Sequence, residues 1–202
     1  MHDKIVNFNY YQKMKRSSAM CEILKKINGK TPLELLKIYN IPLEPPIQLS
    51  KLLKKIGISA LGIDFTDIEI ASNYERGRIL GAAISKGDNL TIFYRKDDTK
   101  NRQRFTIAHE LAHCCLHTKN LQQNHIELRD DALVKTQKEK DADIFAGELL
   151  IPEHILRQIH NEFYVPQLSS LANIFDVSTN VMAARLDYLS MPYFKDVEIT
   201  CK

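Results

Sequence analysis

The pattern of apolar and polar positions divides most of the chain into short helices and strands. Apolar residues three and four apart predict helices over residues 20–27, 31–37 and 48–56. Thr31-Pro32-Leu33-Glu34 is a capping box with proline at the first helical position, and Gly57 is a stop signal after the third helix. The first part of the chain is therefore expected to be helical.

Shorter apolar runs follow these helices and predict three strands, over residues 58–65, 78–85 and 90–95. Gly87-Asp88-Asn89 is a turn signal between the last two strands. Strands joined by a tight turn pair antiparallel. The pattern thus predicts a small, mostly antiparallel sheet.

Two longer helices are predicted in the middle of the chain, each with an apolar stripe. The stripe of the first helix consists of Phe105, Ala108, Leu111, Ala112, Cys115 and Leu116. The stripe of the second consists of Ala142, Phe145, Ala146, Leu149 and Leu150. The polar residues 118–134 between them are expected to form an ordered loop or a short helix.

The remainder of the chain is predicted to be helical. One helix follows Pro152 and reaches about residue 159. A helix pair then covers residues 166–175 and 178–189, with Ser178 as the N-cap of the second helix.

The first long helix carries the sequence His109-Glu110-Leu111-Ala112-His113. Residues four apart share a helix face, so both imidazoles can bind one metal ion. Glu110 lies about 100° around the helix from His109, where it can act as general base toward a water at the metal. This is the arrangement of a zinc-dependent peptidase. The alternative is a helix with two structural histidines.

A catalytic zinc site needs a third protein ligand. His117 continues the histidine stripe, but eight residues span about 12 Å along a helix, too far for one ion to bind both His109 and His117. We expect His117 to lie next to a ligand or at the surface. Glu139 and Asp143 share a face of the second helix, so Glu139 can be the third ligand and Asp143 can accept the outer N–H of a ligating histidine. The alternative is a solvated acidic helix end.

These residues resemble two signatures of the ImmA/IrrE family of zinc metallopeptidases. Residues 102–113 are similar to the Arg-x-Arg-Phe-Thr-x-Ala lead into the zinc helix of that family, and residues 139–152 resemble its second signature. Residues 78–85 and 90–94 are similar to the strands that precede the zinc helix. The resemblance covers about residues 32–190.

The sequence departs from the family pattern at two positions, and neither is an expected metal ligand. Ala112 replaces a frequent glycine, and Ile151 replaces a frequent methionine. The resemblance implies an intracellular peptidase that cuts helix-turn-helix repressors. That substrate class rests on the resemblance alone.

The composition of the chain is that of an ordinary globular protein, with 202 residues, 44% hydrophobic and 26% charged. The sequence has no apolar run of the ~20 residues that a membrane helix needs, and the N-terminus lacks the apolar run of a signal peptide. We therefore expect a cytoplasmic protein. The four cysteines lack Cys-x-x-Cys spacing and are expected to be reduced thiols.

The charge of the two ends bears on possible partners. Residues 1–30 hold seven Lys or Arg and two acidic residues, which suits a solubilising terminus or an acidic partner. The C-terminal pair has helix-turn-helix proportions, which raises DNA binding as a function. However, residues 151–202 hold four Lys or Arg against six acidic residues, and binding DNA requires cations for the phosphates. We interpret the pair as a packing or partner-recognition surface.

Together these features predict an α+β protein in which a small, mostly antiparallel sheet packs on a two-helix zinc-binding core, with additional helices at both ends. We expect a basic N-terminal helical extension over residues 1–30 and a metallopeptidase core over residues 31–165. A C-terminal helix pair, resembling a helix-turn-helix and packed on the core, is expected over residues 166–202.

The function predicted from the sequence is that of a zinc-dependent endopeptidase with one Zn²⁺ per chain. The expected metal ligands are His109, His113 and Glu139, with Glu110 as general base and Asp143 orienting a histidine. The expected substrate is a cytosolic repressor-like transcription regulator or antitoxin, with no membrane partner and no direct binding of nucleic acid. The alternatives are a zinc-stabilised binding module that cuts nothing and, with less support, a DNA-binding regulator.

Overall fold

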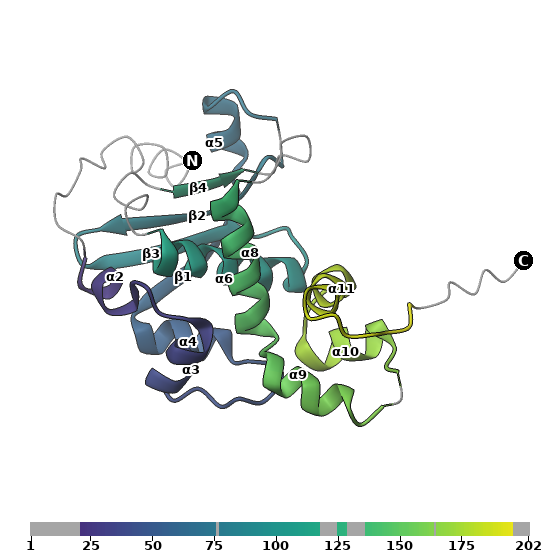
Figure 1. Ribbon diagram of the computed structural model, residues 1–202. Coiled ribbons are helices and arrows are strands. Elements are labelled where there is room, and N and C mark those ends of the chain that lie inside the picture. Colours follow the sequence, from purple (N-terminus) through teal and green to yellow (C-terminus); the bar gives the residue numbers. More distant parts are fainter. Residues whose placement is uncertain (1–20, 76, 118–124, 129–135, 164, 196–202) are drawn as a thin grey trace, which may run out of the picture.

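The computed structural model of the protein describes residues 21–75, 77–117, 125–128, 136–163 and 165–195 (Figure 1). The helices in this part of the chain are α2 (Glu22–Ile27), α3 (Pro32–Ile38), α4 (Leu49–Ile56), α5 (Thr66–Ala71), α6 (Lys100–Leu116), α8 (Gln137–Leu150), α9 (Glu153–His160), α10 (Leu168–Phe175) and α11 (Thr179–Tyr188). The strands are β1 (Ile58–Ile63), β2 (Ile79–Lys86), β3 (Asn89–Arg95) and β4 (His125–Leu128). The expected α+β class is confirmed.

The four strands form one sheet in the order β1-β3-β2-β4. β2 pairs antiparallel with both β3 and β4, as the predicted turn between β2 and β3 requires. β1 pairs parallel with β3, with Ile58 opposite Leu90. The sheet is therefore mixed, and two of its three pairings are antiparallel, as expected.

The segment between the two long helices differs from its prediction. Residues 125–128 are neither loop nor helix but form strand β4 at the edge of the sheet, paired with β2. A four-residue strand is too short for its pattern to be recognised locally, and its hydrogen bonds come from a partner strand elsewhere in the chain. Residues 118–124 and 129–134 of the same prediction lie outside the described residues. Helix α5 was not predicted either.

Local end signals act as predicted in three helices. Thr31 and Glu34 form the capping box of α3, with the Thr31 N–H donating to Glu34 Oε2 at 2.8 Å. Gly57 ends α4 in the left-handed conformation, at φ 95°. The Ser178 side chain accepts a hydrogen bond from the Val181 N–H at the start of α11.

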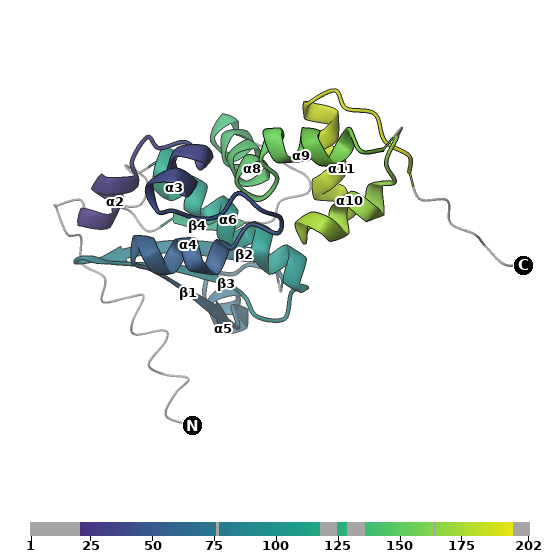
Figure 2. The ribbon, with the colours of Figure 1, turned by 90° about the horizontal axis from the view of Figure 1, so that it is seen from below.

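Helix α6 occupies the centre of the molecule. It packs on β2 and β3, and α8 packs against it from the other side. Figure 2 shows α6 and α8 together on one side of the sheet and α5 on the other. As a result residues 108–115 of α6 are all buried, the two histidines and Glu110 included. Polar side chains enclosed in this way need partners within the protein.

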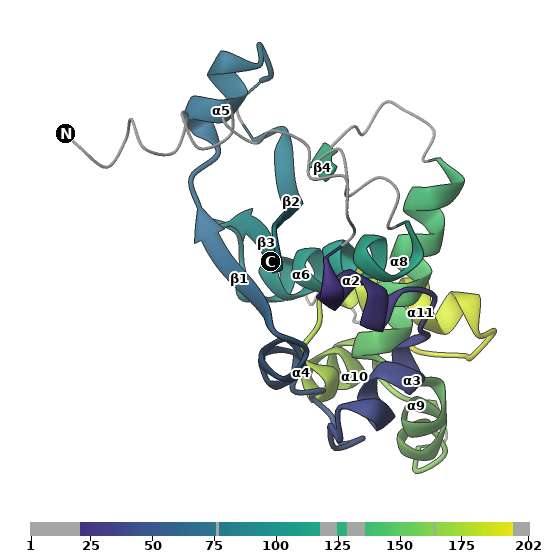
Figure 3. The same ribbon diagram turned by 90° about the vertical axis from the view of Figure 1, so that its left-hand side faces the viewer.

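The C-terminal helices lie beyond α8 as seen from the sheet (Figure 1). α10 packs on α11, and α11 packs on α8. Figure 3 shows α9 and α10 at the end of the molecule opposite α5. Among the described helices, each is too short or too polar to cross a membrane.

A buried ion pair fixes the beginning of β2. The Glu69 carboxylate of α5 accepts hydrogen bonds from the backbone N–H groups of Gly77, at 3.0 Å, and Ile79, at 2.8 Å. Arg95 of β3 pairs with the same carboxylate. These bonds hold the strand whose third residue, Gly81, faces the site described next.

Candidate metal centre

Three side chains from α6 and α8 converge on one point. His109 Nε2 lies 3.0 Å from His113 Nε2 and 3.1 Å from Glu139 Oε2, and the third separation, His113 Nε2 to Glu139 Oε2, is 3.5 Å. Helix geometry places the histidines on one face, and the packing of α8 on α6 brings Glu139 to them. The structure thus brings together the three residues that the sequence proposes as ligands.

The three ligand atoms, His109 Nε2, His113 Nε2 and Glu139 Oε2, form a triangle, and its size and chemistry suit a zinc ion. Nitrogen and oxygen ligands lie about 2.0–2.2 Å from Zn²⁺ in tetrahedral sites, so neighbouring ligand atoms are separated by roughly 3.4 Å. The three observed separations are close to this value. Hydrogen bonds from His109, which has the larger effect, and from His113 lower the pKa of Glu139 well below its usual range. Glu139 is therefore a carboxylate, the form that binds a metal.

The outer nitrogens of both imidazoles have partners of their own. His109 Nδ1 lies 3.0 Å from Asp143 Oδ1, and His113 Nδ1 lies 3.1 Å from His117 Nδ1. A histidine that binds metal through Nε2 keeps its proton on Nδ1, so each ring can donate to the neighbour it contacts. Burial lowers the pKa of His117, which favours the neutral form that can accept this bond. His117 lies next to a ligand, one of the two places expected for it.

Glu110 is fully buried between α6 and the sheet. A Cβ at Gly81 of β2 would lie 2.9 Å from Glu110 Oε1 and 2.7 Å from Thr106 Cγ2. The absence of a side chain at Gly81 therefore makes room for the glutamate. The sequence prediction missed Gly81, although a glycine inside an apolar strand is a signal for close approach.

The cysteines next to this site take no part in the triangle. Cys114 and Cys115 are buried, and burial raises the pKa of both thiols. Within the described part of the chain, the group of His, Cys, Asp and Glu residues that could hold a metal is His109, His113 and Glu139. The helix position of Cys114 away from the histidine face accounts for this.

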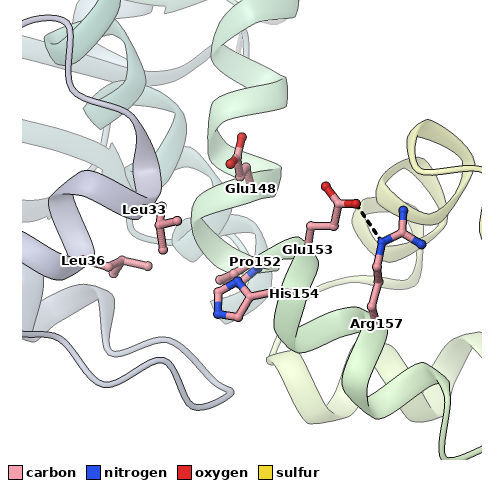
Figure 4. Close-up of a pocket in the computed structure, with 7 residues that line it drawn as sticks. All are labelled: Leu33, Leu36, Glu148, Pro152, Glu153, His154 and Arg157. Carbon is pink, nitrogen blue, oxygen red and sulfur yellow. Dashed lines mark hydrogen bonds and ion pairs between the residues drawn. The ribbon is translucent and has the colours of Figure 1, made fainter.

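Two cavities of the protein lie apart from the metal triangle. Figure 4 shows one of about 310 Å³ between α3 and the junction of α8 and α9, where Glu153 pairs with Arg157 at 2.7 Å. The other, of about 500 Å³, lies between α4, the sheet and the first half of α6, and it contains Lys54, Lys100 and Arg104 together with Asp176. Neither includes a residue of the triangle.

Comparison with protein families places the chain in a class. Residues 57–187, more than half of the chain, match the peptidase M78 family, described as the IrrE N-terminal-like domain. The protein belongs to this family, in agreement with the resemblance seen in the sequence. The match includes α10 and most of α11 as well as the residues of the triangle. No curated protein matches the chain in a sequence comparison.

Membership implies a peptidase-type function. In a metallopeptidase family, two histidines and a glutamate with convergent ligand atoms suggest a site for a metal ion. The fold and the family thus define a peptidase with a candidate metal centre between its two central helices.

Proposed function

We propose that the protein is a zinc-dependent endopeptidase whose metal is held by His109, His113 and Glu139. The observation that carries this proposal is the convergence of three ligand atoms beside a buried glutamate, in a chain of a peptidase family. Two histidines and one carboxylate leave an open position on zinc, which is typical of catalytic rather than structural sites.

The metal and the side chains around it have different roles in the proposed reaction. Zinc, when bound, supplies a Lewis acid that polarises the scissile carbonyl and lowers the pKa of water. Glu110 takes the proton of the attacking water and passes it to the amine that leaves. Asp143 and His117 hold the two imidazoles with Nε2 facing inward, through the contacts at their Nδ1 atoms.

We further propose that the substrate is a cytosolic regulator of the helix-turn-helix repressor or antitoxin type. The likeness of the sequence to the ImmA/IrrE signatures supports this substrate class. The acidic balance of the C-terminal helix pair supports a protein partner rather than DNA. Asp187 and Tyr188 of α11 are exposed and available for such a contact.

A cleavage assay with a matched pair of variants tests the function. A candidate helix-turn-helix regulator is incubated with zinc-loaded protein, and the products are measured by intact mass. The wild type and Glu44→Gln, the same change at an exposed site, should produce two fragments whose masses sum to the substrate plus one water. Glu110→Gln should produce none, because the base is removed while the ligands remain.

Other outcomes separate the alternatives. Equal cleavage by Glu110→Gln would exclude the proposed base. Cleavage of unfolded casein but not of the regulator would contradict the substrate class and keep the endopeptidase. A protein that holds zinc and cuts neither would be the binding module, and a mobility shift of DNA at physiological salt would favour the DNA-binding regulator.

A further inference from the structure

A third cavity adjoins the candidate metal centre. It has a volume of about 300 Å³ and lies between α6, α8 and α11. Asp143, which contacts His109, forms part of its wall. The cavity therefore shares a residue with the contacts of the metal triangle, unlike the two cavities described above.

On both central helices, residues that line the cavity lie about one or two helical turns from residues of the metal triangle. On α8, Glu139, Asp143 and Gly147 follow one another at four-residue spacing, so they share a face. The first belongs to the metal triangle, the second contacts His109, and the third lines the cavity.

Helix α6 shows the same order of residues, from the metal triangle to the cavity, but toward its N-terminus. On α6, His113 and His109 belong to the triangle, and Phe105, four residues before His109, lines the cavity. The centroids of the Phe105 and His109 rings lie 6.2 Å apart. Since one helical turn rises about 5.4 Å, the cavity begins within the reach of a substrate side chain close to the metal.

The walls of the cavity are mainly apolar. Phe105 comes from α6, Ile144 from α8, and Val181, Ala184 and Tyr188 from α11. Ile144, Ala184 and Tyr188 are exposed, so the cavity opens to solvent and a peptide can enter it. Cavities of this size and lining bind apolar groups.

Gly147 gives the cavity part of its depth. The residue is buried in the interior of α8, where glycine destabilises a helix relative to alanine. A Cβ at this position would meet its nearest neighbour, Arg185 Cδ, at 3.8 Å, an ordinary van der Waals contact. Packing therefore does not require glycine here, and its effect is to leave space on the cavity side.

The cavity wall has two charged side chains, Asp143 and Arg185, and both already have partners; that of Asp143 is His109. Arg185 is only 5% exposed, and its Nε donates to the Ile151 carbonyl at the end of α8, at 3.2 Å. Its guanidinium lies over the Tyr188 ring, 5.7 Å from the centroid. Because Arg185 is a cation, it repels basic side chains from the cavity. Because it is already bound to the negative end of a helix, it pairs less strongly with an acidic side chain.

We propose that this cavity is a specificity subsite that takes a large apolar side chain, such as leucine, methionine or phenylalanine, next to the bond that is cut. The inference rests on the proposed function and names the kind of residue that the peptidase selects. Ala184 on α11 and Gly147 on α8 determine how large that side chain can be.

A peptide pool measures this preference directly. Zinc-loaded protein digests peptides prepared from a proteome, and mass spectrometry identifies the cut sites. The wild type should favour leucine, methionine or phenylalanine at one position flanking the cut. Ala184→Phe fills the cavity from its exposed side and should shift that preference to alanine, glycine or serine by about ten-fold or more.

Two further variants keep the comparison matched. Thr179→Phe adds the same ring at an exposed position of α11 outside the cavity, and it should keep the wild-type preference. Gly147→Ala adds one methyl group that the structure can hold, so it should fold and disfavour phenylalanine relative to leucine. Enrichment of acidic residues at the selected position would overturn the proposal in favour of an Arg185 carboxylate site.

A binding measurement tests the subsite without cleavage. Calorimetry compares leucine hydroxamate with glycine hydroxamate on the zinc-loaded Glu110→Gln variant. Leucine hydroxamate should bind about ten-fold tighter or more, and Ala184→Phe introduced into the same variant should remove the difference.

The outcomes distinguish the subsite from the function on which it rests. Equal affinity of the two hydroxamates, no binding of either to a protein that holds zinc, or an unchanged difference in Ala184→Phe would refute the subsite. Cleavage without preference would refute it too, while the endopeptidase would stand. Absence of zinc from the wild type would instead remove the metal centre and the subsite with it.

Discussion

Gly81 of β2 lies directly against Glu110 of α6, so that a methyl group on the glycine would stand 2.9 Å from the carboxylate oxygen Oε1. The strand and the helix that meet here are separated in sequence by β3. Because both residues sit between the sheet and a helix packed on it, neither can move aside freely. The backbone of β2 therefore sets the position of the proposed general base.

The first prediction follows from this contact. Gly81→Ala should displace the Glu110 carboxylate and lower kcat/KM for a cleaved peptide by about 10–100-fold, because misplacing a catalytic group by about 1 Å has effects of this size. Zinc content should stay at the wild-type level, since no ligand is touched. Ser85→Ala, later on the same strand, is the control and should retain activity. Wild-type kinetics in Gly81→Ala would show that Gly81 does not set the position of Glu110.

Metal content tests the ligand set. The purified protein should hold one zinc per chain, measured by inductively coupled plasma mass spectrometry. His109→Ala, His113→Ala and Glu139→Ala should each lose most of it. His117→Ala should retain it, because His117 contacts the outer nitrogen of His113 and not the triangle. Loss of zinc in His117→Ala as complete as in His109→Ala would contradict this assignment.

Asp143→Asn should weaken zinc binding by about 10–100-fold, as is usual when a charged partner of a ligating histidine is neutralised. The dissociation constant is measured by competition with a chelator. Asp141→Asn removes a charge from the same helix, where Asp141 accepts a hydrogen bond from Gln137, and should leave the affinity unchanged. Equal affinities for the two variants would mean that Asp143 does not act through His109.

Gly147→Ala should stabilise the protein by roughly 0.5–1 kcal/mol, measured as the free energy of unfolding in urea. The reason is that alanine favours the helix and its Cβ meets nothing closer than 3.8 Å. Gly81→Ala should act in the opposite direction, by about 1–3 kcal/mol, through overpacking. A destabilised Gly147→Ala variant would show that the cavity beside α8 is smaller than described.

The buried thiols of α6 should be inert in the folded protein. Burial raises the pKa of Cys114 and Cys115, so that neither forms the reactive thiolate at pH 8. Treatment with a thiol reagent at this pH, followed by peptide mass mapping, should leave both unlabelled, while unfolding in urea should expose them. Rapid labelling of either cysteine in the native protein would contradict the packing of α6.

The sequence alone determined those features that depend on neighbours within one or two helical turns. The spacing of His109 and His113 places them on one face of a helix whatever surrounds it. Thr31, Gly57 and Ser178 set helix ends through contacts with residues nearby in the chain. The hairpin of β2 and β3 likewise follows from a local turn. Asp143 was named from the sequence because a ligating histidine needs a partner for its outer nitrogen.

The tertiary structure decided everything that depends on which elements meet. It placed Glu139 at the two histidines, His117 at the outer nitrogen of His113 and Gly81 against Glu110. It also paired residues 125–128 with β2 and left a cavity between α8 and α11. A local pattern cannot specify such contacts, because they arise from the packing of segments far apart in sequence and their energy comes from surfaces that only the complete fold brings together.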